Sequence, residues 1–286
     1  MLQVPVGTGE RRLKRVIVTA DDFGISTPVN EAIEDAYRHG ILTTTCLMVG
    51  APAADDAVRR AKQIPQMGVG LHLVIVCGRP ILPASQVPDL VDALGRFDTN
   101  LFRAGVRYFF LPHVRRQLAR EIRAQFEAFA KTGLSLDHVN AHNHLHIHPT
   151  VFSMILRIGK DYGLRAIRIL FEPPPPQGKV SVTEHFVGMW ISLMRRRAAR
   201  YEIRVNDRMY GLRDTGRMNL ERLKPILESL PDGVSEVVCH PATGRWPETE
   251  DAAYDYQFEE EYRALLHDDV RRAVKDADLI SFRDIP

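Results

Sequence analysis

The sequence predicts an α/β fold in which helices cover a parallel sheet or barrel. Three segments with β-propensity alternate with two segments of helical periodicity between residues 16 and 74. Such alternation is typical of parallel strands, because a helix usually makes the crossover between them. The 286 residues, of which 45% are hydrophobic, are enough for one large α/β domain or two small ones.

The first predicted strand, over residues 16–20, ends in two adjacent carboxylates, Asp21 and Asp22. Its apolar and β-branched side chains favour a buried strand, and ligands of parallel α/β proteins bind where such strands end. The glycine at position 24 allows the chain to turn there, so both carboxylates can face one cavity. Two carboxylates in an apolar setting repel each other unless a cation or a proton separates them. A strand end followed by a helix cap is the alternative interpretation.

The elements after this strand follow in alternation. A helix is expected to begin at a cap on Ser26 or Thr27, with Pro28 in its first turn, and to end at residues 39–40. Residues 78–100 predict a long loop, which in a compact domain usually covers a functional site. Further strands are predicted over 41–49, 68–74, 137–140 and 164–170, and helices over 52–61, 114–130 and 151–162.

Four consecutive prolines at positions 173–176 interrupt this alternation and predict an extended polyproline spacer. Residues 180–201 are first apolar and then strongly basic, and 206–216 predict a loop. The remaining segments predict helices over 220–230 and 259–277 and strands over 234–239 and 279–282. Because strands on both sides of the prolines are needed for one sheet, we expect a single domain over 1–286, with an inserted substrate- or lipid-facing region around 173–216.

Charge and cysteine content exclude several classes of protein. The formal net charge of +2 does not indicate a nucleic-acid partner. Three widely separated cysteines form neither a disulfide framework nor a zinc–thiolate motif, and they fit a reducing compartment. The sequence has no signal-peptide core and no apolar run long enough to cross a bilayer. We therefore expect a cytoplasmic protein, and surface contact with a membrane remains open; the oligomeric state is not predicted.

The segment after residue 140 contains histidines at every second position: His142, His144, His146 and His148. If this segment is extended, all four imidazoles lie on one face. His72 ends another predicted strand, so Asp22, His72 and one histidine of the run would supply a carboxylate oxygen and two imidazole nitrogens. Such a set suits zinc or another divalent ion, magnesium included, with positions left open for water and substrate. A solvated polar face, a simple metal-binding tract and a core role for His72 are the alternatives.

Three further residues can complete a hydrolytic site. Asp21, next to the predicted ligand Asp22, is placed to accept a proton from water, as a general base. His240 ends the strand predicted over 234–239 and suits the general acid, because histidine titrates near pH 7. Arg168 is a charged residue within a strand-like run, and it could orient Asp21 by an ion pair or simply occupy an edge strand.

Four motifs in this order resemble those of the YdjC-like carbohydrate deacetylases: Thr19-Ala20-Asp21-Asp22-Phe23-Gly24, Gly70-Leu71-His72, the stretch 137–146, and Cys239-His240-Pro241. The resemblance implies a distorted (β/α) barrel related to polysaccharide deacetylases, with one divalent metal ion, and hydrolysis of an N-acetyl group from an amino sugar. By position it implies the ligands Asp22, His72 and His142, the base Asp21 and the acid His240.

The chain departs from that family at Asn140, where an aspartate is frequent. If that position orients a ligand, an amide replaces the acceptor but not the charge. His144 and His146 are then expected as supporting or substrate-contacting groups, with His144 as the reserve ligand.

Residues 49–54, 69–83 and 141–150 look closest to the hopanoid-biosynthesis-associated branch of the family. This resemblance implies an N-acetylglucosaminyl hopanoid as the substrate. Aromatic and apolar side chains beside arginines, typical of surfaces that lie on anionic membranes, independently indicate lipid-facing residues at Phe109, Phe110, Trp190 and Met194. We therefore expect a glycolipid substrate and peripheral contact with the inner membrane surface. A helix packed on the barrel, a soluble substrate such as chitobiose, and a metal- or lipid-binding protein without turnover are the alternatives.

Overall fold

The computed structural model describes residues 14–174, 182–247 and 253–286 of the chain. Within the predicted polyproline spacer, Pro173 and Pro174 are irregular, whereas Pro175 and Pro176 lie outside the described residues.

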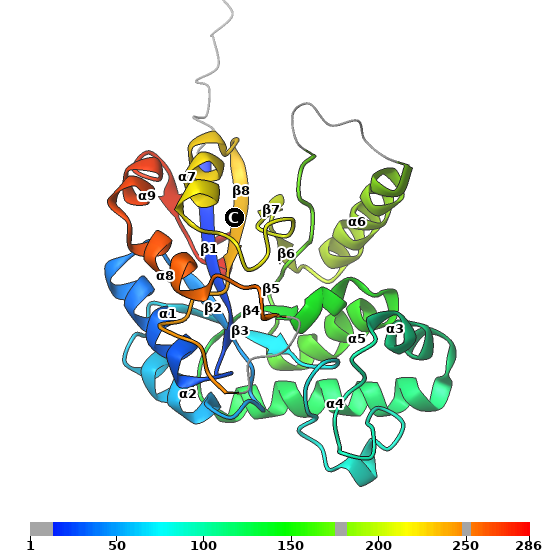
Figure 1. Cartoon of the computed structure of the whole chain (residues 1–286). Helices are drawn as coiled ribbons and strands as arrows, with labels where there is room; N and C mark the ends of the chain where they lie inside the picture. The colour runs from blue at the N-terminus through cyan, green and yellow to red at the C-terminus, as the bar shows by residue number, and fades with distance from the viewer. Residues whose placement is uncertain (1–13, 175–181, 248–252) are drawn as a thin grey trace, which may run out of the picture.

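Parallel strands form one curled sheet at the centre of the molecule (Figure 1). Their order is β6-β5-β4-β3-β2-β1-β8-β7, and β9 pairs with β1 beside this path. The two end strands, β6 and β7, do not pair with each other in the described part of the chain, so the barrel is open. The strands are β1 (Lys14–Phe23), β2 (Thr44–Leu47), β3 (Gly68–Leu73), β4 (Leu136–Ala141), β5 (Ala166–Ile167), β6 (Arg204–Val205), β7 (Arg208–Tyr210), β8 (Gly233–Cys239) and β9 (Asp278–Leu279).

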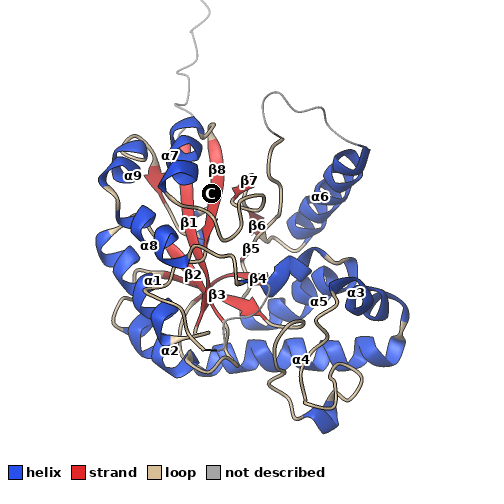
Figure 2. Cartoon of the chain, in the orientation of Figure 1, coloured by secondary structure: helices blue, strands red, loops and turns tan. Residues whose placement is uncertain are grey.

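Helices surround the convex side of this sheet, as Figure 2 shows. The predicted α/β fold, a distorted (β/α) barrel, is therefore confirmed. Each helix contributes apolar side chains to the core cluster that the strands also form, as expected for strands that helices cover. The helices are α1 (Thr27–His39), α2 (Ala54–Lys62), α3 (Leu101–Phe110), α4 (Pro112–Lys131), α5 (Pro149–Gly159), α6 (Val182–Arg200), α7 (Leu220–Ser229), α8 (Phe258–Leu266) and α9 (Asp268–Ala273).

The chain between β1 and α2 is fixed by caps that the sequence partly predicted. Ser26 is the N-cap of α1, and its hydroxyl oxygen accepts from the Val29 N–H at 3.4 Å. The side chain of Asn30 accepts from the Gly24 N–H at 2.7 Å and donates to the Ala53 carbonyl at 3.0 Å. These bonds hold the turn that directly follows Asp21 and Asp22.

Several predicted boundaries differ from the structure. The strand expected over 164–170 has only two residues in β5, and the loop expected over 206–216 contains β7. The helix expected over 259–277 is divided into α8 and α9, because His267 adopts extended backbone angles between them. The region 173–216 places α6 outside the sheet but also supplies β6 and β7 to it.

None of the helices in the described ranges is long and apolar enough to cross a membrane.

Candidate active site

The carboxyl ends of β1, β3, β4 and β8 meet at one cavity of about 110 Å³. Asp21 and Asp22 reach it from β1, His72 from β3, His142 from the residue after β4, and His240 from the residue after β8. Parallel strands place such ends at the same edge of the sheet, which is why residues distant in sequence converge there.

Three of these side chains form a compact group of donor atoms. Asp22 Oδ1 lies 3.2 Å from His72 Nε2 and 3.1 Å from His142 Nδ1. One donor atom from each residue lies within 4.8 Å of the others, close enough to share one ion. The structure therefore brings together the three residues that the sequence singled out, and their role as ligands stays a prediction.

The backbone of Asp22 explains how two adjacent residues reach one cavity. Its φ is +65°, in the left-handed region that non-glycine residues rarely adopt. Neighbouring side chains on a regular strand point to opposite faces, and this twist at the end of β1 turns Asp22 toward the side of Asp21. Strained backbone of this kind clusters at functional sites.

Arg168 forms a buried ion pair with Asp21. The guanidinium is fully buried and donates to Asp21 Oδ2 at 2.6 Å and to Asp21 Oδ1 at 2.8 Å. It also contacts Glu236 Oε1 at 2.8 Å, and the Thr19 hydroxyl donates to that same oxygen at 2.7 Å. Arg168 therefore orients Asp21 by a buried, two-point ion pair, and the edge-strand alternative is wrong.

The buried charges at this end of the sheet favour a cation. Asp21, Asp22 and Glu236 supply three carboxylates, and Arg168, the one permanent cation in direct contact with any of them among the described residues, contacts Asp21 and Glu236. Burial alone would raise the pKa of both aspartates, but Arg168 lowers that of Asp21, and His142 and His72 lower that of Asp22, to well below the usual range. Ionised carboxylates beside imidazoles, with charge left uncompensated, are the chemistry that a divalent ion prefers.

A second group of donor atoms, Asp21, Cys46 and His72, fits an ion less well. Both oxygens of Asp21 already accept from Arg168. Burial, and then the charge of Asp21, raise the pKa of the Cys46 thiol well above its usual value, so it remains a donor, to Asp21 Oδ1 at 3.1 Å. The Asp22 group is therefore the better cation site.

Asn140 links the predicted ligand to the predicted base. Its Oδ1 lies 2.7 Å from His72 Nδ1, and its Nδ2 donates to Asp21 Oδ1 at 3.2 Å. A hydrogen bond from Nδ1 leaves His72 Nε2 as the free nitrogen that faces Asp22. The amide thus supplies the acceptor that the frequent aspartate would supply, and adds a donor toward Asp21.

The histidine run is not extended, and this prediction is wrong. Residues His142–Ile147 form a short 3₁₀-type turn in which Asn143 and His144 have φ of 52° and 56°. His144 lines the cavity, and burial, with a further contribution from Arg168, lowers its pKa to about 3. His146 is fully buried away from the cavity, and its Nδ1 accepts from the Ala141 N–H at 3.1 Å. The four rings therefore have different surroundings.

His240 lies at the other wall of the cavity. Its ring packs against Tyr256 with centroids 5.3 Å apart, and its backbone N–H donates to Glu261 Oε2 at 2.5 Å. Glu236, Cys46 and Glu261 also surround the site but were not predicted from the sequence. Glu236 carried a detectable signal, because it is a charged residue inside the apolar strand β8, as Arg168 is beside β5.

The predicted lipid-facing residues divide into two groups. Phe109 and Phe110 are 47% and 68% exposed, as expected for a contact surface. Trp190 is half-buried and donates to the Ile147 carbonyl at 2.9 Å. Met194 is fully buried, so its lipid-facing assignment is wrong: it shares the packed face of α6 with Ile191 and Ala198, three and four positions away.

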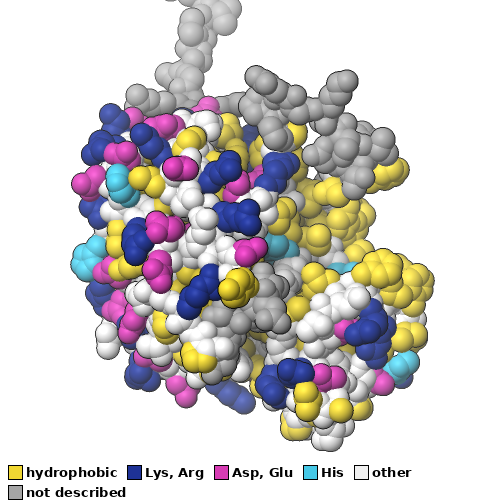
Figure 3. Space-filling view, viewed as in Figure 1, with side chains coloured by type: hydrophobic (Ala, Val, Ile, Leu, Met, Phe, Trp, Pro, Cys, Tyr) yellow, Lys and Arg dark blue, Asp and Glu magenta, His cyan; other side chains and the backbone are white. Residues whose placement is uncertain are grey.

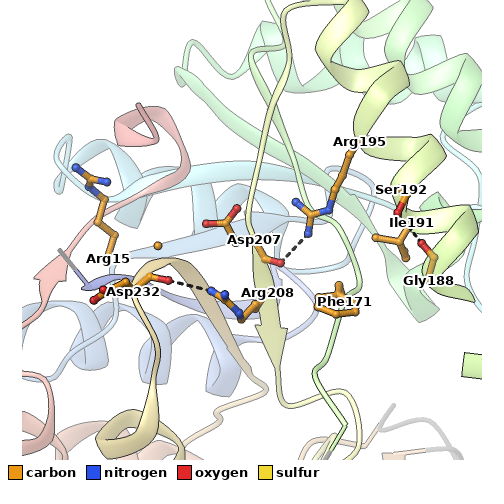
Figure 4. A pocket seen from close by; sticks show the side chains of 10 residues that line it. Arg15, Phe171, Gly188, Ile191, Ser192, Arg195, Asp207, Arg208 and Asp232 are labelled. Atoms are coloured by element: carbon orange, nitrogen blue, oxygen red, sulfur yellow. Dashed lines mark hydrogen bonds between the residues drawn. The ribbon is translucent and has the colours of Figure 1, made fainter. Parts of the chain in front are cut away.

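A larger cavity, of about 590 Å³, lies at the opposite end of the strands, between α6 and the beginnings of β1, β7 and β8 (Figure 4). Two of the three arginines that line it donate to backbone carbonyls: Arg195 to Asp207 at 2.6 Å, and Arg208 to Asp232 at 3.0 Å. It contains none of the predicted catalytic or metal-binding residues. Size alone therefore does not identify the reactive cavity in this molecule.

Known proteins resemble the chain along most of its length. A carbohydrate deacetylase of Geobacillus stearothermophilus is 32% identical over 94% of this chain and 96% of that one. A carbohydrate deacetylase of Brevibacillus brevis is 40% identical over 52% of this chain, and the aligned part spans about half of that relative, 56%. A protein of Enterococcus faecalis V583 has the same fold in its crystal structure, where it is described as a candidate cellobiose-phosphate cleavage protein. The TM-score is 0.72 at 23% identity, and the match covers 94% of this chain and 98% of that one. Residues 15–276 match the family described as YdjC-like protein, and the chain therefore belongs to the YdjC-like family.

Proposed function

We propose that this protein is a carbohydrate deacetylase that hydrolyses the N-acetyl group of an amino sugar, giving a free amine and acetate. One observation carries the proposal: the donor atoms of Asp22, His72 and His142 converge in the same cavity as Asp21. The near full-length alignment with a carbohydrate deacetylase supports the same reaction class.

In this proposal Asp22, His72 and His142 hold one divalent ion, with zinc favoured by two imidazoles and one carboxylate. When bound, such an ion polarises a carbonyl and lowers the pKa of water. Asp21 accepts the proton of the attacking water, and Arg168 keeps it ionised and fixed in direction. A carboxylate with a lowered pKa is a weak base, so the acidity that the ion gives to water is what makes the transfer feasible.

His240 donates a proton to the departing amine in the same proposal. It lines the cavity together with Asp21. Cleavage of the C–N bond requires a proton on the nitrogen, because a deprotonated amine is too basic to leave. His144 lines the cavity as well, and its lowered pKa keeps it neutral and able to hydrogen-bond the substrate.

The proposed substrate is an N-acetylglucosaminyl lipid of the hopanoid type. The exposed phenylalanines of α3 support a hydrocarbon-bearing substrate, because they offer apolar surface near the segment that follows His142. A soluble N-acetylated oligosaccharide such as chitobiose is the second candidate. Binding of metal or lipid without turnover is the third.

Acetate release by the purified protein, loaded with a divalent ion, tests the reaction. We expect turnover of an N-acetylglucosaminyl lipid in detergent, seen by mass spectrometry as the loss of one acetyl group. Asp21→Asn should lower kcat by at least about 100-fold, since general-base catalysis contributes about 10²–10⁴-fold. Asp22→Asn should lower activity because it removes the charge of a proposed metal ligand. Asp55→Asn, at an exposed position of α2, is the matched control and should keep full activity.

The outcomes separate the three candidates. Comparable or faster release of acetate from chitobiose would replace the lipid-linked substrate by a soluble one. Full activity of Asp21→Asn would remove the base assignment. Stoichiometric binding of the ion with no acetate released from either substrate would favour the binding protein.

A further inference from the structure

Two helices on one side of the molecule carry an unusual amount of exposed apolar surface. Figure 3 shows hydrophobic side chains gathered where α3 and α6 lie. The surface, called the α3–α6 face below, comprises Leu101, Phe102, Val106, Phe109 and Phe110 of α3 and Phe186, Val187, Met189 and Leu193 of α6. Contiguous apolar surface of this kind on a soluble protein usually marks a binding surface.

The exposed side of α6 is organised along its length. Phe186, Met189 and Leu193 are 64%, 59% and 46% exposed, and their spacing of three and four residues places them on one stripe of the helix. The same spacing continues through Arg196 to Arg200, both of them exposed. The stripe is therefore apolar in its first turns and cationic in its last.

The other side of α6 packs against the rest of the protein. Ile191, Met194 and Ala198 are buried against the body of the protein, about 150° around the helix from this stripe at about 100° per residue. The helix thus already has its core-facing side, and the stripe is additional apolar surface that the fold of the described residues does not use.

Both helices contact the segment that follows the candidate ligand His142. Trp190 of α6 donates to the Ile147 carbonyl, and the next residue, His148, packs against Phe109 of α3 with ring centroids 6.2 Å apart. Ile147 and His148 end the turn that begins at His142. The α3–α6 face therefore adjoins the segment that supplies a proposed ligand.

We propose that the α3–α6 face docks on the surface of an anionic lipid bilayer. Exposed aromatic and aliphatic side chains would enter the headgroup region, and arginines at its margin would contact lipid phosphates. Arg115 and Arg116, at the start of α4, are exposed and, like Arg196 and Arg200, have no ion-pair partner among the described residues. The helix α3 contains no acidic residue.

This charge pattern favours a bilayer over a second copy of the chain. A symmetric dimer through the α3–α6 face would bring two arginine-rich margins of like charge together, whereas anionic lipid neutralises them. Docking is independent of the proposed reaction. Only its use, the presentation of lipid-linked sugar to the cavity beside His142, rests on the proposed function.

Sedimentation of the full chain with vesicles tests the docking. We expect the protein to bind vesicles of phosphatidylcholine containing phosphatidylglycerol more tightly than vesicles of phosphatidylcholine alone, and added salt to weaken the binding. The triple variant Phe186→Ser, Met189→Ser, Leu193→Ser should bind at least about 100-fold more weakly, because three partly exposed apolar side chains no longer enter the bilayer. The pair Arg196→Gln, Arg200→Gln should lose about 25-fold, at about fivefold for each arginine near an anionic surface.

Leu94→Ser is the matched control, because Leu94 is 63% exposed but lies outside α3 and α6. Circular dichroism should show all variants folded, and their acetate release from chitobiose should match that of the parent protein. Absence of vesicle binding by the parent, or equal binding by the triple variant and the control, would overturn the proposal. If the parent protein binds no vesicles but elutes as a dimer in size-exclusion chromatography, and the triple variant elutes as a monomer, the face would be assigned to a second copy of the chain. A failure of acetate release leaves the vesicle result intact, so the two proposals fail separately.

Discussion

Replacing Arg168 by methionine tests the buried ion pair on which the candidate site is built. The substitution keeps much of the side-chain volume but leaves Asp21 and Glu236 without their shared cation. Breaking a buried ion pair by removing one partner costs about 3–5 kcal/mol. At about 2–4 °C for each kcal/mol in a chain of this size, the melting temperature should fall by roughly 6–20 °C.

The loss of stability should depend on pH in a defined direction. With Arg168 present, the pKa of Asp21 lies below its ordinary value, so the stabilisation is present above the ordinary pKa and is lost as pH falls through the lowered one. Without Arg168, burial prevails and raises that pKa. The variant then gains stability as Asp21 takes up a proton, so its deficit should shrink between pH 7 and about pH 4.

Urea unfolding of chelator-treated protein at several pH values measures this effect without interference from a bound ion. Arg165→Met is the matched control, because Arg165 is exposed three residues earlier, and it should unfold like the parent at every pH. Arg168→Lys should restore only part of the stability, since an ammonium cannot make the two-point contact. A deficit below about 1 kcal/mol, or one that stays constant from pH 7 to pH 4, would refute the reasoning.

Three other substitutions test separate features. Asn140→Ala should weaken divalent-ion binding by about 10–100-fold in calorimetric titration, because His72 loses the acceptor that fixes its ring. Met194→Ala should lower the free energy of unfolding by about 2–5 kcal/mol, whereas Phe110→Ala should change it by less than about 0.5 kcal/mol in the same urea series; equal effects would contradict the assignment of Met194 to the packed face. Gly70→Ala should cost about 1–3 kcal/mol in thermal unfolding, since the added Cβ would lie 2.6 Å from the ring of the buried His138 and 2.8 Å from its backbone carbonyl oxygen, and an unchanged melting temperature would contradict this close packing of β3 on β4.

Strand ends were the part of the site that sequence could predict. Apolar runs that stop at a charged or imidazole side chain placed Asp21, Asp22, His72 and His240 at the same edge of a parallel sheet, and the structure brings them to one cavity. The direction of the strands is sufficient for this prediction. The hydrogen-bond and ion-pair partners of these residues could not be predicted, because they depend on which strands lie side by side.

Local backbone geometry was the part that sequence could not predict. Histidines at every second position favour an extended segment, but positive φ at Asn143 and His144 turns the chain instead. Asparagine and histidine tolerate positive φ better than most residues, but they do not require it, so the composition alone does not mark the turn. The hydrogen bond from the Ala141 N–H to His146 Nδ1, five residues later, closes this turn, and the alternating pattern does not indicate it.

Asp22 places one constraint on anyone who wishes to dissect or redesign this cavity. Its backbone conformation is one that asparagine and aspartate tolerate better than alanine does. A truncation to alanine would therefore perturb the path of the main chain as well as remove the carboxylate, and an activity assay could not separate the two effects. Asparagine separates coordination chemistry from chain geometry at this position, and grafting the motif onto another barrel requires the torsion angle to be transferred along with the residue.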